Sequence, residues 1–93
     1  GGTYNWGSSA GERAVGAMTS GSFASPNSLM AWFQNGNTSS ITQLAVSYRG
    51  ERYRINMANA SIEFYYSTDG SNWIAVAAGN IAASSFVTGA SAY

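Results

Sequence analysis

The sequence predicts an all-β fold, an antiparallel β-sandwich of jelly-roll or immunoglobulin-like kind with about six or seven short strands. Within residues 41–66, two runs alternate apolar with polar or small side chains at period two, which is typical of half-buried strands. Asn35-Gly36 and Asp69-Gly70 are tight-turn signals between such runs. The 93 residues are enough for a single domain, residues 1–93, with one thin core.

The two central runs have the clearest pattern. Strand-forming side chains recur at every second position, with Ser, Ala and charged residues between them. The alternating positions are Leu44, Val46 and Tyr48 in the first run, and Ile62, Phe64 and Tyr66 in the second. We expect these side chains to face the core.

The N-terminal part predicts two further strands. Residues 3–6 form an extended first strand with Tyr4 and Trp6 on one face. Residues 13–18 follow as a second strand, because glycines at 11, 16 and 21 oppose a helix by about 1 kcal/mol each.

Residues 29–34, with the sequence LMAWFQ, are apolar on both faces. Leu29 and Phe33 point to one side, and Met30 and Trp32 point to the other. Such a strand is either central, with both faces covered, or it faces a partner. Residues 73–78 and 86–93 predict the last strands, after the Asp69-Gly70 turn.

Charge and composition exclude several classes of function. The chain has four arginines, four acidic residues, no lysine, no histidine and no cysteine. It therefore lacks the basic surface that nucleic acid requires, the commonest general base and any disulfide. No apolar run approaches the roughly 20 residues of a membrane span. Low charge with abundant Gly, Ser and Asn favours association and is typical of secreted proteins.

Three segments carry a family resemblance: residues 12–16 (ERAVG), residues 41–54 (ITQLAVSYRGERYR) and residues 64–73 (FYYSTDGSNW). Together they resemble a β-sandwich domain of secreted bacterial surface proteins, of the kind found in exported proteins with PEP-CTERM tails. Glu12 stands where that family usually has Asp. The resemblance covers roughly residues 3–78 and implies an extracellular or cell-surface protein without known catalytic residues. The family continues with further strands, so this chain is either a shortened version or is completed by a neighbouring subunit.

Candidate assembly residues follow from the exposed edges of an incomplete sandwich, which a second copy can satisfy by strand addition. We expect the chain ends and the doubly apolar run to provide them. The candidates are Thr3, Tyr4, Trp6, Met30, Trp32, Phe86, Val87 and Tyr93.

A second set of candidates fits glycan binding. Tyr65 offers a ring for sugar stacking, and Arg52 and Arg54 offer donors to sugar hydroxyl or carboxylate groups. The alternative interpretation of the arginines, Arg13 included, is an ion-pair network with Glu51 that holds strand ends and satisfies backbone carbonyls.

Metal binding and catalysis have little support in the sequence. Asp69 with Asn72 and Asn80 could supply oxygen ligands to calcium, but one carboxylate is too few and turn geometry explains it. A serine triad lacks its histidine, and a glycosidase needs two facing carboxylates. We therefore expect no enzyme, metal or cofactor.

The leading hypothesis is a non-catalytic extracellular subunit that associates with copies of itself into a filament or surface assembly. The alternative is a carbohydrate-binding or adhesive module of a larger surface protein, with polysaccharide as its partner.

Overall fold

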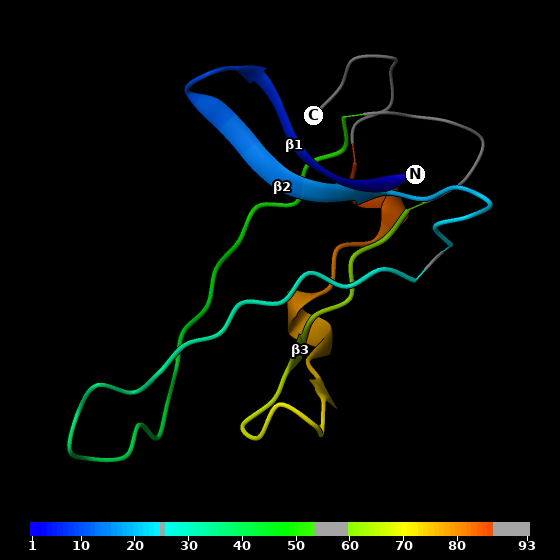
Figure 1. Ribbon diagram of the computed structural model, residues 1–93. Helices are drawn as coiled ribbons and strands as arrows, with labels where there is room; N and C mark the ends of the chain where they lie inside the picture. The colour runs from blue at the N-terminus through cyan, green and yellow to red at the C-terminus, as the bar shows by residue number, and fades with distance from the viewer. Residues whose placement is uncertain (25, 54–59, 87–93) are drawn as a thin grey trace. The chain divides into compact units, whose positions relative to one another are not determined.

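The computed structural model describes residues 1–24, 26–53 and 60–86 of the 93-residue chain (Figure 1). It consists of two compact units, Gly1–Tyr48 and Arg49–Tyr93. Within these described ranges, each unit contains one two-stranded antiparallel sheet. No α-helix occurs in the described ranges, so the fold class is all-β, as the sequence predicts.

The first unit is built on a β-hairpin. Strand β1 (Gly2–Ser9) pairs antiparallel with β2 (Glu12–Met18), and both predicted N-terminal strands are thereby confirmed. Tyr4 lies opposite Gly16 and Trp6 opposite Ala14. Cross-strand partners share a face, so Tyr4 and Trp6 occupy the same face of the sheet, as predicted.

The pairing shifts by one residue near the turn of this hairpin. Between Trp6 and Ser9 the first strand advances three positions, while β2 advances two, from Ala14 to Glu12. One extra residue on a single strand is a β-bulge, which increases the local twist. Gly7 lies in the bulge, where a side-chain Cβ would overlap the Glu12 carbonyl oxygen.

Residues 26–48, all of them described, form no strand or helix (Figure 1). The predictions of strands at residues 29–34 and over the first central run are therefore wrong for this structure. Both runs have strand-like side chains, but a strand also needs a neighbour for its N–H and C=O groups. Among the described residues, no backbone hydrogen bond links residues 29–34 or 41–47 to a second strand.

The second unit contains a short hairpin formed by β3 (Tyr65–Tyr66) and β4 (Ile74–Ala75). The pairing continues beyond the strands: the Val76 amide donates to the Phe64 carbonyl at 2.9 Å, and Ile62 and Ile81 exchange two bonds of 2.9 Å. The predicted second central run and the following strand are confirmed in position but are shorter than expected.

Two turns of 3-10 helix, η1 (Ala77–Gly79) and η2 (Ala83–Ser85), end the described part of this unit. The first replaces the end of the predicted strand 73–78. Gly79 lies against Phe64, where a Cβ would be 2.7 Å from the Phe64 Cβ. This close approach explains why the chain turns at a glycine.

The apolar contacts of the second unit gather around Gly50. A Cβ at this position would lie 2.7 Å from the Ile81 Cδ1, 2.9 Å from the Ile62 Cδ1 and 3.6 Å from the Phe86 Cζ. These side chains are half-buried. The guanidinium carbon of Arg52 lies 5.3 Å from the centre of the Phe86 ring, a cation–π distance.

Four strands lie in the described ranges, so a sandwich of six or seven strands is not confirmed. The predicted last strand lies outside the described residues, apart from Phe86. Among the described residues, no helix is long and apolar enough to cross a bilayer.

Candidate association surface

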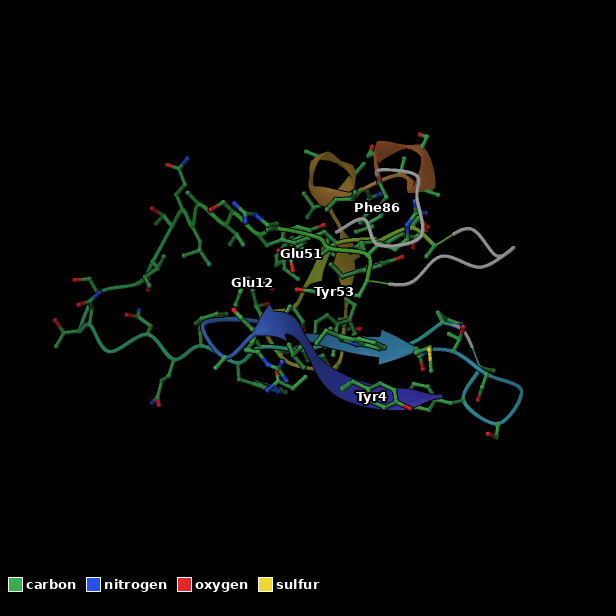
Figure 2. All side chains as sticks on the ribbon, turned by 90° about the horizontal axis from the view of Figure 1, so that it is seen from above. Tyr4, Glu12, Glu51, Tyr53 and Phe86 are labelled. Carbon is green, nitrogen blue, oxygen red and sulfur yellow. The ribbon has the colours of Figure 1, made fainter. Side chains whose placement is uncertain are left out.

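An aromatic pair marks one face of the first hairpin. Tyr4 lies on β1 (Figure 2). Its ring and that of Trp6 have centroids 5.1 Å apart and are tilted by 56° to each other. Tilted rings at this distance are a favourable aromatic geometry. Tyr4 is exposed and Trp6 is half-buried, because the indole lies over Gly16. The pair is thus held in place by the strand beneath it, with Tyr4 open to solvent.

Thr3, a third candidate from this segment, is exposed and lies opposite Ala17. Its side chain therefore belongs to the other face of the sheet from Tyr4 and Trp6. A single partner surface stacked on the aromatic face would not reach Thr3.

Arg13 crosses the bulge and holds it from the side of β2. Its guanidinium donates one hydrogen bond of 2.8 Å to the Asn5 carbonyl and another of 3.4 Å to the Gly7 carbonyl. A planar group with several fixed donors suits these two carbonyls, two residues apart on one strand, better than an ammonium would. For Arg13, the interpretation as a residue that satisfies backbone carbonyls is confirmed.

Met30 and Trp32 lie in the stretch without secondary structure and are strongly exposed, at 62% and 76%. Phe33, which the sequence reasoning did not select, is exposed by 87%. Phe33 belongs to residues 29–34, the run that is apolar on both faces, so the sequence pattern could have indicated it. Phe86 is half-buried beneath Arg52, within its own unit. Val87 and Tyr93 lie outside the described residues.

The glycan candidates lie in the second unit. Tyr65 is 46% exposed, and its hydroxyl donates a 2.8 Å hydrogen bond to the Glu63 carboxylate. That hydrogen bond, together with the negative charge of Glu63, raises the pKa of Tyr65. Tyr66, which we expected to face the core, is 45% exposed. Arg52 lies over Phe86 instead of projecting freely, and Arg54 lies outside the described residues.

Glu51 has two partners in this unit. Its carboxylate accepts a 2.6 Å hydrogen bond from the Tyr53 hydroxyl and lies 4.0 Å from the Arg49 guanidinium (Figure 2). The expected ion pair between Glu51 and an arginine is present, although Arg49 forms it and its side chain is mostly exposed. At this distance and exposure, such a pair adds little to stability.

The turn between β3 and β4 is organised by Asp69. One carboxylate oxygen accepts bonds from the Ser71 and Asn72 amides, both at 2.8 Å, and from the Ser67 hydroxyl at 2.9 Å. The other accepts a 2.7 Å bond from the Asn72 side chain. These donors, led by the Asn72 amide, hold the pKa of Asp69 far below its ordinary range.

Hydrogen bonds within the chain occupy the side chains that the sequence offers as oxygen ligands for calcium. Asp69 and Asn72 bind each other, and the Asn80 side-chain oxygen accepts a 2.9 Å bond from the Phe64 amide. In the described ranges, no three His, Cys, Asp or Glu residues gather as a metal site would require.

Comparison with known proteins gives no assignment: no family model matches the chain, and no match was found among curated proteins or solved structures.

Proposed function

We propose that this chain is a non-catalytic extracellular structural protein whose copies associate with one another, by strand addition or edge packing, into a filament or surface assembly. The observation that carries the proposal is the exposure of large apolar side chains. Fourteen such residues of the described ranges are exposed by between 41% and 87%.

Exposure on this scale distinguishes the chain from an ordinary monomer. Single apolar residues on a surface are normal, but contiguous apolar patches mark interaction sites. Here the exposed residues include sequence neighbours, among them Leu29 with Met30, Trp32 with Phe33, and Tyr65 with Tyr66. Covering them removes apolar surface from water, which is the main favourable term in protein association.

Association also supplies what a β-sandwich requires. The runs at residues 29–34 and 41–47 have strand-like side chains but form no strand in the single chain. Pairing with a second copy would satisfy their backbone groups and add strands to the four described. In this proposal, the sandwich of six or seven strands forms only when copies of the chain associate.

The location and class in this proposal depend on composition and on the family resemblance. Residues 12–16, 41–54 and 64–73 resemble a domain of exported bacterial surface proteins. Little charge, with no lysine, lowers the repulsion between copies. The lack of histidine and cysteine removes two common sources of catalytic nucleophiles and bases.

The test is the mass of the native protein in solution, measured by light scattering, with negative-stain imaging of the same sample. We expect particles or fibres much larger than the 9.7 kDa single chain. A clean monomer across the accessible concentration range would overturn the proposal.

A second function, a carbohydrate-binding or adhesive module, is favoured by one observation. Tyr65 and Tyr66 are adjacent, exposed aromatic residues, and flat rings match the apolar faces of sugars. This function predicts a monomer that is retained on a polysaccharide, with retention weakened in Tyr65→Ala. Absence of binding across a glycan array would remove this candidate.

A further inference from the structure

We infer that residues 28–47, here called the uncharged arm, pair with the same residues of a second copy of the chain. This inference rests on the proposed function, which names self-association but not the segment that performs it. Three properties of the arm support it: its exposed apolar area, the lack of a strand partner for it among the described residues, and its lack of charge.

The exposed area of the arm is that of a real interface. Seven large apolar side chains of the arm are exposed by more than half: Leu29, Met30, Trp32, Phe33, Ile41, Leu44 and Val46. At roughly 100 Å² of exposed surface each, they expose about 700 Å² over both faces of the arm, against the roughly 800 Å² that each partner buries in a standard interface. Strand pairing between two arms, with packing of one face, would bury part of this area.

A formed turn at residues 35–39 favours strand pairing by the two runs of the arm. The Asn35 side chain donates a 2.9 Å hydrogen bond to the Ser39 carbonyl and accepts another of 2.9 Å from the Asn37 amide. The turn between the two strand-like runs is thus formed, while the described runs on either side have no strand partner (Figure 1). Forming this turn in advance lowers the entropy that pairing must overcome.

The charge distribution favours a second arm as the partner of the arm. All eight charged residues lie outside the arm, and residues 14–48 contain none. Pairing two arms therefore buries no charge, whereas packing an arm against the charged parts of the chain would desolvate Arg or Glu side chains. Identical segments can also pair antiparallel about a two-fold axis, so that each contact occurs twice.

Both runs of the arm also have the composition of self-pairing strands. Residues 28–34 and 41–47 are apolar or polar but uncharged, and contain neither proline nor glycine. Short segments of this kind pair with copies of themselves when their edges are open. Arg49 lies two residues beyond the end of the arm, as charged residues commonly flank strands of this type.

The test compares two valine substitutions in the full chain. Val46→Lys places a charge in the arm, at a side chain 58% exposed, and Val15→Lys places the same charge on β2, at a side chain 67% exposed. Light scattering over a concentration series measures self-association. We expect Val46→Lys to weaken it by at least roughly tenfold, because a lysine buried between apolar strands loses its hydration. Val15→Lys should change it less than about threefold.

The outcomes separate this inference from the proposed function. If wild type and both variants associate equally, or if both variants lose association equally, the arm is not the contact segment, although self-association stands. If the wild type is monomeric, the proposed function and this inference fall together.

Cross-linking gives a second measurement that does not depend on a disruptive variant. The chain has no cysteine, so Ala45→Cys in the arm and Ala17→Cys on β2 each introduce a single thiol. Both positions are exposed. We expect mild oxidation to link Ala45→Cys into disulfide dimers several-fold faster than Ala17→Cys. Equal rates would overturn the pairing of arm with arm.

Discussion

The indole of Trp6 lies directly over Gly16 on the neighbouring strand. A Cβ at residue 16 would lie 2.7 Å from the Trp6 Cδ1 and 3.0 Å from its Nε1. Trp6 pairs with Ala14, so Gly16 is its diagonal neighbour, and Tyr4 lies directly opposite Gly16. The missing side chain at Gly16 therefore leaves the space that the Trp6 indole occupies, and the Tyr4 ring lies next to that indole.

Gly16→Ala should destabilise the first hairpin. Forcing a methyl group against the indole costs about 1–3 kcal/mol. Replacing a glycine in a strand recovers roughly 0.5–1 kcal/mol. We expect a net loss of about 1 kcal/mol and a change in tryptophan fluorescence, measured by denaturant unfolding at a fixed protein concentration.

Gly11→Ala is the matched control for that substitution. Nothing lies within 4 Å of a Cβ at residue 11, and its φ is not positive. Its stability should stay within about 0.5 kcal/mol of wild type. A Gly16→Ala variant as stable as this control would contradict the position of the indole.

Arg13→Ala should loosen the bulge in β1. It removes the donors to the Asn5 and Gly7 carbonyls, at a cost of about 1 kcal/mol for exposed bonds of this kind. We expect faster amide hydrogen exchange in residues 5–9 than in wild type. The control is Arg49→Ala, which removes an arginine that lies 4.0 Å from the Glu51 carboxylate and belongs to the other unit. If Arg49→Ala speeds exchange in residues 5–9 equally, the effect does not come from the bulge.

The turn around Asp69 should lose stability only in strong acid. Because hydrogen bonds lower the pKa of Asp69 in the folded chain, its contribution is complete above the unfolded pKa of about 4 and is lost as the pH falls through the lower folded value. An NMR pH titration should show the Ser71 and Asn72 amides unchanged through the ordinary carboxylate range. A transition near pH 4 at these amides would show that the carboxylate is not held as described.

Asp69→Ala should destabilise the same turn at neutral pH. It removes the acceptor for the Ser67 hydroxyl, both backbone amides and the Asn72 side chain. We expect faster exchange at residues 71 and 72. Thr68→Ala, in the same turn and exposed, should leave exchange there close to wild type.

Glu63→Gln should lower the pKa of Tyr65 toward its ordinary value of about 10. The Glu63 carboxylate raises that pKa by accepting the phenol proton in a hydrogen bond and by repelling the phenolate. An NMR titration of the tyrosine ring carbons measures it, and Glu51→Gln serves as the control. No change in Glu63→Gln would mean that the hydrogen bond does not form in solution.

Local signals in the sequence predicted where the strands of the two hairpins lie, but not that the first two strands pair with each other. The two strands of the first hairpin were predicted from the alternation of side chains and from glycines that oppose a helix. The turn at Asp69-Gly70 follows from residue type, and Gly70 adopts a φ of 75°, which glycine tolerates without strain. Each of these elements is stabilised by residues close to it in sequence.

The same reasoning failed at residues 29–34 and 41–48. Their alternation describes side chains suited to a half-buried strand, but it contains no information on which segment would pair with them. Likewise, the packing of Trp6 on Gly16 and the hydrogen bond from Arg13 to the Asn5 carbonyl depend on the cross-strand register. Spacing along the chain does not reveal that register.

The sequence by itself therefore determined the all-β class, the positions of the two hairpins and the absence of charge from residues 14–48. These properties depend on local conformational preference and composition. Only the tertiary structure decided which strand-like runs form strands and which large apolar side chains stay exposed. Pairing and burial require a neighbour in space, and that neighbour is specified by the whole arrangement of the chain and not by any one segment.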